Sequence, residues 1–189
     1  MTLTSAEYLA KAIGAAMGGG GAHQYEATST LQYGSEVERW AIVIIPGTLY
    51  WSSKSLSTGR IQSFDPQTLS LHDGQESISL SLDRIPRTFP DAVKLGFPLS
   101  LPIWGRDRDE YHPISVEHQD NDVVLILRHQ KDRALFGSYT FDGESRRAKR
   151  LVTPTQVLQQ EVKLPDTTNS AGVSFGFVSG TARCTDNDL

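Results

Sequence analysis

Histidine and carboxylate side chains are the residues of this sequence best suited to chemistry, and one grouping of them could bind a metal. His118 and His129 lie on either side of a predicted turn that contains Asp120 and Asp122. Two histidines and a carboxylate are enough to hold a metal ion if a hairpin brings them together. Their spacing matches no metal-binding motif, and polar residues beside turns are usually solvated. We therefore expect no metal and no cofactor.

A second candidate for chemistry is the sequence GVSFG at residues 172–176, which matches the G-x-S-x-G nucleophile motif of serine hydrolases. That motif requires a preceding strand, a following helix and a downstream histidine, whereas no histidine follows His129. We interpret the match as a chance occurrence in a segment rich in glycine and serine. No pair of carboxylates lies in a context that predicts a raised pKa. The sequence thus provides no catalytic residue, and the expectation is a non-enzymatic protein.

Length and charge narrow the class of protein further. A chain of 189 residues is long enough to form one domain that buries about 70% of the surface of its unfolded form. Its formal net charge of −4 argues against a nucleic-acid-binding protein, because such proteins neutralise phosphates with basic residues. Its single cysteine, Cys184, excludes an intramolecular disulfide and a cysteine-based zinc site.

No targeting signal is recognisable in the sequence. Residues 1–17 lack a basic leader, and Glu7 and Lys11 interrupt the apolar residues that a signal peptide would need. No stretch approaches the ~20 apolar residues of a membrane-spanning helix. We expect no membrane span. The localisation is unknown: cytoplasmic if the sequence is complete, and the bacterial envelope if a signal was trimmed from a precursor.

The elements that would position any site are organised around residues 36–57. Residues 40–45 (WAIVII) form a nearly continuous apolar run, which is typical of a strand at the centre of a packed sheet. Pro46 ends that run because proline has no amide hydrogen for the strand ladder. The chain resumes at residues 48–51 (TLYW) with residue types that favour a half-buried strand. Two strands joined at Pro46 are therefore the predicted centre of the fold.

The remaining pattern predicts one short helix and a series of antiparallel hairpins. Thr4 and Glu7 have the spacing of a capping box at the start of a helix, which the glycines at 18–21 end. Asp73-Gly74 is the strongest hairpin signal. Residues 155–164 form either a last strand or a helix. The other predicted strands are residues 23–33, 61–64, 68–72, 77–82, 113–117, 123–128, 134–141 and 147–152.

The resulting fold class is mainly β (α+β), with a curved antiparallel sheet or incomplete β-barrel and a short N-terminal helix. Residues 1–165 form a single antiparallel β domain, and the polar residues 166–189 form a flexible C-terminal tail. The prolines of residues 84–104 exclude a long strand or helix there, although residues 90–96 can form a short helix. We predict that this helical and proline-rich segment covers one face of the sheet. Residues 105–110 (GRDRDE) predict a charged surface loop, with a calcium site as the weaker alternative.

The order of these parts resembles a known superfamily. After a short helix come YEATSTLQYGSEVERWAIVIIPGTLYW, FDPQTLSLHDGQESISL, PRTFPDAVKLGFPLSLPIW and a set of hairpins that ends in TFDGESRRAKRLV. Over residues 5–164 this pattern resembles the LolA-like lipoprotein-carrier superfamily, which includes the mycobacterial LppX and LprG lipid carriers. The resemblance implies an incomplete β-barrel whose open face is plugged by helices and whose apolar cavity receives acyl chains. The residues that it implies for the helical plug are Phe89, Val93, Leu95, Phe97 and Leu99, and those for the sheet wall are Trp40, Ile42, Ile44, Leu49 and Trp51.

The bulky aromatic residues near the predicted core have two interpretations. They either fill a solid core or line a concave apolar pocket between the curved sheet and the covering segment. The second interpretation predicts a non-enzymatic binding protein that holds a lipid, acyl chain or other apolar ligand. The alternative function is a structural or protein–protein interaction module that acts through a sheet edge or face, with a protein partner and no small-molecule ligand. The predicted ligand-binding residues are Trp40, Ile42, Ile44, Leu49, Trp51, Phe89, Val93 and Phe97.

Overall fold

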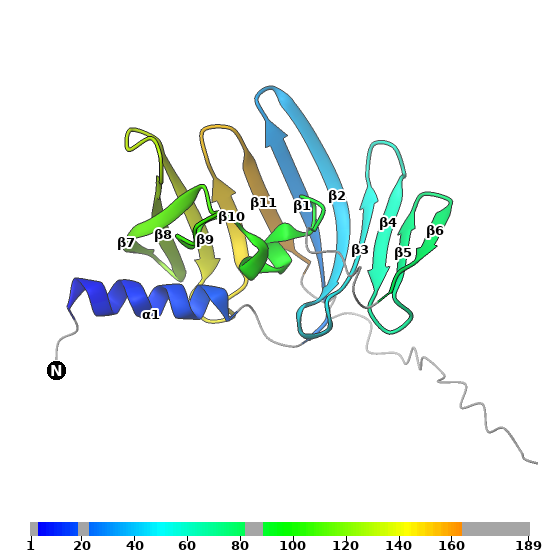
Figure 1. Ribbon diagram of the computed structural model, residues 1–189, viewed down its shortest axis with the longest axis horizontal. Coiled ribbons are helices and arrows are strands. Elements are labelled where there is room, and N and C mark those ends of the chain that lie inside the picture. Colours follow the sequence, from blue (N-terminus) through cyan, green and yellow to red (C-terminus); the bar gives the residue numbers. More distant parts are fainter. Residues whose placement is uncertain (1–3, 19–22, 82–88, 164–189) are drawn as a thin grey trace, which may run out of the picture.

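An open, curved antiparallel sheet of eleven strands forms the body of the fold (Figure 1). The computed structural model describes residues 4–18, 23–81 and 89–163. Across the sheet the strands follow the order β6-β5-β4-β3-β2-β1-β11-β10-β9-β8-β7, so the sheet ends at β6 and β7 and is not closed. The strand bounds are β1 Tyr25–Tyr33, β2 Glu36–Ile45, β3 Tyr50–Ser55, β4 Ile61–Asp65, β5 Ser70–Asp73, β6 Glu76–Ser79, β7 Tyr111–Gln119, β8 Asp122–His129, β9 Phe136–Asp142, β10 Ala148–Val152 and β11 Val157–Val162.

Two meanders make up this sheet. Strands β1 to β6 form one, strands β7 to β11 form the other, and the antiparallel pairing of β1 with β11 joins them. In that pairing Ala27 lies opposite Val162, and Leu31 lies opposite Leu158. The predicted class, mainly β with a curved, unclosed antiparallel sheet and an N-terminal helix, is confirmed. Of the two alternatives for residues 155–164, the strand is correct, because β11 pairs on both sides.

The helix α1 (Ser5–Met17) begins at the predicted capping box. The backbone amide of Thr4 donates to the Glu7 carboxylate at 2.7 Å, and the Thr4 hydroxyl accepts from the Glu7 amide at 3.3 Å. The bond from the Thr4 backbone lowers the pKa of Glu7. The helix packs on β7, where the rings of Tyr8 and His118 meet edge to face at 5.9 Å. Among the described residues, no helix is both long enough and apolar enough to cross a membrane.

One face of the sheet carries the core. Alternate residues of a strand point to the same face, and the register aligns them across neighbouring strands. Ile44 thus lies between Tyr25 of β1 and Trp51 of β3, and it is fully buried. Its neighbours Val43 and Ile45 are only half-buried, so the apolar run of β2 is central in the sheet but packed mainly on one side.

Residues 89–104 pack against this core without forming the predicted helix. The prediction of a helix over residues 90–96 is wrong: the segment contains two 3-10 turns, η3 (Lys94–Gly96) and η4 (Pro98–Ser100). Phe97 precedes a proline and adopts φ −127° and ψ 69°, outside the helical region that a following proline disfavours. The turn η3 contacts β10 and β11, and the side chains from this segment that join the core are Ala92, Val93, Leu95, Phe97, Leu101 and Ile103.

Several sequence predictions concern residues outside the described ranges. They are the rest of the glycine run at 19–21, residues 84–88 of the proline-rich segment, the tail 166–189 with Cys184, and the GVSFG match at 172–176.

Candidate functional site

Two hollows share Phe89 as a wall, and together we call them the Phe89 groove. The first lies where α1 ends and reaches η1 (Pro46–Thr48) and η4, with a volume of about 200 Å³. The second lies over β3, β4 and β5, with a volume of about 340 Å³. The first hollow is lined mainly by apolar residues, including Met17, Pro46, Leu49, Phe89, Phe97 and Leu99. The second is lined by Trp51, Gln62, Leu71, His72, Asp73, Phe89 and Pro90.

An aromatic stack holds Phe89 in place. Its ring centroid lies 4.1 Å from that of Phe97, and the two ring planes differ by 11°. Phe97 is buried, whereas Phe89 is half-buried. Stacked aromatic pairs contribute about 0.5–1.5 kcal/mol beyond the area that they bury. The stack therefore anchors one face of Phe89 while the residue remains accessible to both hollows.

Four of the predicted ligand-binding residues, Leu49, Trp51, Phe89 and Phe97, line the groove. The sequence predicted a strand at Leu49, but the structure places this residue outside the strands, just before β3. It follows the turn η1 with a left-handed φ of 63°, and it is 43% exposed. This position places Leu49 at the rim of the first hollow.

The other four predicted residues are not among those that line the groove. Ile42, Ile44 and Val93 are at most 1% exposed and lie inside the packed core. Trp40 is half-buried against that core, and its indole nitrogen donates a hydrogen bond of 3.1 Å to the carboxylate of Glu38. The sheet under the groove is thus packed, and the space that remains is above the core.

The second hollow has a polar end at Asp73. Arg60 donates two hydrogen bonds to the Asp73 carboxylate, at 2.7 Å from Nε and at 2.5 Å from a terminal nitrogen. These bonds hold the pKa of Asp73 below its usual value. A ligand with one polar end would find apolar walls at Phe89 and Trp51 and a charged rim at Asp73.

Two polar tethers hold the segment that forms the groove. The carboxylate of Asp91 accepts a hydrogen bond from the Tyr33 hydroxyl at the end of β1. In the loop at 105–110, Arg106 donates to Asp109 and, at 2.9 Å, to the backbone carbonyl of Leu99. Burial alone would raise the pKa of Asp109, but the hydrogen bonds from Arg106 lower it. The predicted charged loop is thus an ordered support for η4.

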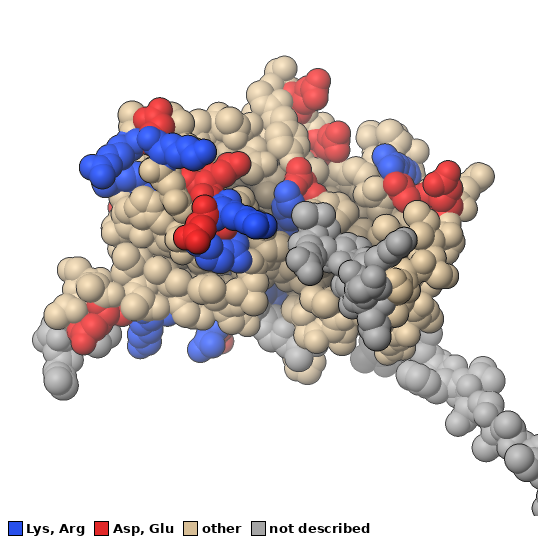
Figure 2. Space-filling model, in the orientation of Figure 1, with Lys and Arg blue, Asp and Glu red and all other residues tan. Residues whose placement is uncertain are grey.

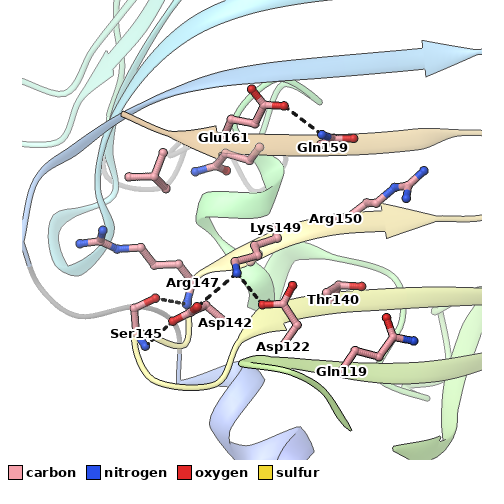
Figure 3. Close-up of a pocket in the computed structure, with 13 residues that line it drawn as sticks. Gln119, Asp122, Thr140, Asp142, Ser145, Arg147, Lys149, Arg150, Gln159 and Glu161 are labelled. Carbon is pink, nitrogen blue, oxygen red and sulfur yellow. Dashed lines mark hydrogen bonds and ion pairs between the residues drawn. The ribbon is translucent and has the colours of Figure 1, made fainter. Parts of the chain in front are cut away.

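A second site opens where β10 and β11 part, and we call it the β10–β11 cleft (Figure 3). Its volume is about 690 Å³. Its lining is polar and charged, and includes Asp122, Asp142, Arg147, Lys149, Gln160 and Glu161. On the surface above β8, β9 and β10, acidic and basic side chains are interleaved (Figure 2). Sequence reasoning missed this cleft; its one signal was Gln160, a polar residue on the otherwise apolar face of the strand predicted at 155–164.

Lys149 bridges two carboxylates at the edge of this cleft. Its Nζ lies 2.5 Å from Asp122 and 3.2 Å from Asp142. The hydrogen bond to Asp122 is the main reason why the pKa of Lys149 is raised. The pKa of Asp142 is lowered to about 2. The largest cause is the backbone amide of Ser145, which donates a hydrogen bond of 2.7 Å to the Asp142 carboxylate.

The lowered pKa of Asp142 predicts how acid affects stability. An aspartate whose pKa is lower in the folded state than in the unfolded state stabilises the fold at pH values above its unfolded-state pKa of ~3.9. This contribution is lost as the pH falls toward 2. We expect Asp142→Asn to be about 1 kcal/mol less stable than the wild type at pH 7, because solvent screens this partly exposed carboxylate. Urea unfolding should show the two proteins converging near pH 2. A difference that persists unchanged at pH 2 would contradict the electrostatic cause.

The two histidines considered as metal ligands lie at opposite ends of a hairpin. In the pairing of β7 with β8, His118 is opposite Val123 near the turn, and His129 is opposite Tyr111 at the far end. The hypothesis that they approach each other is therefore wrong, because the antiparallel register separates them by the length of the strand. Within the described ranges, no group of three or more His, Cys, Asp or Glu residues is placed to hold a metal ion.

Comparison with known proteins identifies no family for this chain. No family model and no curated protein matches it. Among solved structures, an uncharacterised conserved protein from Thermus thermophilus is similar with a TM-score of 0.41 and 9% identity, over 84% of this chain and 86% of that chain. MucB, solved in complex with MucA(peri), is similar with a TM-score of 0.40 and 11% identity, over 90% of this chain and 60% of that chain. The resemblance to the LolA-like superfamily stays a prediction from the sequence.

Proposed function

We propose that this protein is a non-enzymatic binding protein that holds an acyl chain or another apolar ligand in the Phe89 groove. The observation that carries the proposal is the place of Phe89, a half-buried aromatic residue that lines both hollows. A ligand lying across Phe89 would contact the sheet through Trp51 and the 3-10 turns through Phe97. The groove thus lies between the curved sheet and the segment at 89–104.

The size and polarity of the groove support a narrow, mostly apolar ligand. The second hollow, of about 340 Å³, reaches by itself the ~300–1,000 Å³ that is usual for small-molecule sites, and the first, of about 200 Å³, is smaller. Each methylene group that leaves water contributes about 0.8 kcal/mol, so even a short acyl chain gains affinity along such walls. The polar rim at Asp73 and Arg60 suits a ligand whose head group stays in contact with water.

Organic extraction of the natively purified protein, followed by mass spectrometry, tests the proposal directly. A stoichiometric lipid or other apolar compound in the extract supports it and identifies the ligand class. Any ligand that binds only the folded state must also raise thermal stability. An empty extract, together with no thermal shift on adding palmitate, would therefore refute the proposal.

Removing the shared wall should weaken binding. We expect Phe89→Ala to reduce the affinity for palmitate by about tenfold or more, since an aromatic anchor at the centre of a site carries much of its binding energy. The matched control is Phe136→Ala, because Phe136 of β9 is 48% exposed and lines neither hollow. Displacement of a fluorescent fatty acid measures both variants. Equal losses in the two variants would place the ligand elsewhere.

A protein-interaction module is the second candidate, and β6 favours it. All four residues of β6 are exposed, and among the described strands it pairs with β5 alone. An edge strand of this kind offers unpaired backbone groups to another chain. Native mass spectrometry and cross-linking distinguish the two candidate functions. A protein that stays monomeric and carries a lipid would support the ligand-binding function and contradict the protein-interaction function.

A further inference from the structure

The two edges of the sheet differ in their protection against pairing with another chain. At one edge, β7 contains Pro113, which has no amide hydrogen to offer, and a bulge where its pairing with β8 shifts between Pro113 and Ser115. The helix α1 also packs on β7. Prolines, bulges and covering helices are usual devices that keep an edge strand from pairing with another chain. The β7 edge therefore carries three of these devices.

The strand β6, at the other edge, has neither a proline nor a bulge. Its four residues, Glu76–Ser79 (ESIS), are all exposed, and their pairing with β5 is regular. Among the described strands, β6 pairs with β5 alone (Figure 1). An unprotected edge strand is a template on which a further strand can pair.

The free backbone groups of β6 belong to Ser77 and Ser79. The amide of Leu80 donates to the carbonyl oxygen of Leu69, so the backbone of Leu80 points toward β5. Backbone groups alternate in direction along an antiparallel strand. Those of Ile78 therefore also point toward β5, and those of Ser77 and Ser79 point to the open edge. Each serine thus offers one donor and one acceptor to a further strand.

The same edge ends a row of apolar side chains that crosses the sheet from β2. The register pairs these residues one after another: Ile44, Trp51, Phe64, Leu71 and Ile78. Their burial falls along the row, since Trp51 and Phe64 are 2% exposed, Leu71 is half-buried and Ile78 is 51% exposed. A further strand beside β6 would give Ile78 a neighbour on its open side, as the other members of the row already have.

The sequence of β6 is complementary to a second copy of itself. In a two-fold symmetric dimer the same patch contacts itself, and a residue on the axis faces its own copy. With the axis at Ile78, two antiparallel β6 strands pair Ser77 with Ser79 of the partner subunit, so the free backbone groups of both strands form four hydrogen bonds. The two Ile78 side chains then meet in a non-hydrogen-bonded pair, where side chains lie closest. Glu76, the charged residue of β6, lies opposite Leu80 of the partner subunit, so no like charges face each other.

We propose that β6 is the contact surface of a symmetric homodimer, in which the sheets of two copies join edge to edge through antiparallel β6 strands. The partner is a second copy of this chain, because the order Ser-Ile-Ser is the same on both sides of an axis at Ile78. The inference rests on the interaction role described above as the second candidate function, and it names the partner for that role. It does not depend on a ligand in the Phe89 groove, which Ile78 does not line.

Sedimentation equilibrium of the full chain over a series of concentrations tests the dimer. We expect the average mass to rise from one chain toward two with concentration, because a small contact gives weak association. Ile78→Lys should weaken the association by about tenfold or more, since two lysines would face each other across the axis. Ile61→Lys is the matched control: Ile61 is 46% exposed and lies in β4, two strands from the edge.

Three results of this experiment would overturn the proposal. The first is a mass that stays at one chain up to ~1 mM protein. The second is a dimer that Ile78→Lys leaves intact, because its contact would then lie elsewhere. The third is an equal loss of association in Ile78→Lys and Ile61→Lys. If Ile78→Lys fails to fold, the wild-type series and a cross-linking experiment decide.

Disulfide cross-linking locates the contact at single residues. In a chain that carries Cys184→Ser, Ile78→Cys should form a covalent dimer on mild oxidation. The reason is that the Cα atoms of a non-hydrogen-bonded pair lie about 4.5 Å apart, a separation that a disulfide can span. Ile61→Cys in the same background should stay monomeric. Absence of the Ile78→Cys dimer, or equal cross-linking of the two variants, overturns the proposal. Palmitate binding is measured separately on the same proteins, so failure of the dimer and failure of the Phe89 groove are distinguishable.

Discussion

Replacing Gly137 with alanine should lower the free energy of unfolding by about 3 kcal/mol, at the upper end of the usual cost of an overpacked core. Gly137 lies in β9 opposite Leu127 of β8. A Cβ atom at this position would lie 2.6 Å from the backbone carbonyl oxygen of Val152 in β10. A paired backbone cannot move aside as the end of a flexible side chain can, so β9 and β10 would have to separate. This separation should also disturb the packing of Leu151, a buried residue of β10 that pairs with Tyr139 of β9.

Gly14→Ala is the matched control for this prediction. Gly14 lies in α1, and no heavy atom lies within 4 Å of the Cβ that an alanine would add. Alanine favours a helix over glycine by about 0.8–1 kcal/mol, so this variant should be more stable than the wild type. Urea denaturation should therefore show midpoints shifted in opposite directions. A shift in the same direction for both variants would show that the approach of Gly137 to Val152 does not control stability.

The elements of the fold that the sequence predicted correctly depend on neighbouring residues. The apolar run at 40–45 and Pro46 identified the centre and the end of β2, and the capping box at Thr4 identified the start of α1. Asp73-Gly74 forms the hairpin between β5 and β6, with Gly74 at a φ of 63°. Each of these signals acts within a few residues, so no knowledge of the three-dimensional arrangement was needed to interpret it.

The features that escaped sequence analysis depend on residues far apart in the chain. Tyr25 and Gln160 are 135 positions apart and meet only because β1 pairs with β11, so no local pattern could predict the hydrogen bond between them. The helix expected at residues 90–96 had adequate local propensity, but the chain there packs closely on β1 and β2 through Gly96. Tertiary packing of this kind commonly overrides propensity in short segments.

The candidate ligand site was predicted in part. The resemblance to LolA-like carriers suggested Phe89 and Phe97, and both line the groove. The same reasoning also suggested Ile42 and Ile44, but the choice between a filled core and a pocket depends on the side chains from the segment at 89–104. Those side chains belong to the same core cluster as Ile42 and Ile44, which are at most 1% exposed. Apolar character alone could not distinguish a groove wall from a core residue.

Gly96→Ala should lower the free energy of unfolding by about 2 kcal/mol and also weaken palmitate binding. Gly96 of η3 lines the first hollow, and an alanine Cβ there would overlap Cδ1 of Ile44 and lie 3.0 Å from the Tyr25 hydroxyl. Ile44 is fully buried, so its side chain has little room to change rotamer. We expect η3 to move outward and to displace the neighbouring Phe97. Denaturant unfolding measures the first effect, and fatty-acid displacement at a temperature where the variant is folded measures the second.

The double variant Gly96→Ala/Ile44→Val separates this overlap from a general weakening of the core. Ile44→Val alone should cost about 1 kcal/mol, because it removes a buried methyl group. In the Gly96→Ala background, Ile44→Val removes the atom that the new methyl group overlaps. The double variant should therefore lose less unfolding free energy than the sum of the losses in the two single variants, by at least about 1 kcal/mol. Palmitate affinity should recover together with stability, because both depend on η3 returning to its place. Additive costs would mean that Gly96 and Ile44 do not pack together, and the groove would then have to be held open by the Phe89–Phe97 stack alone.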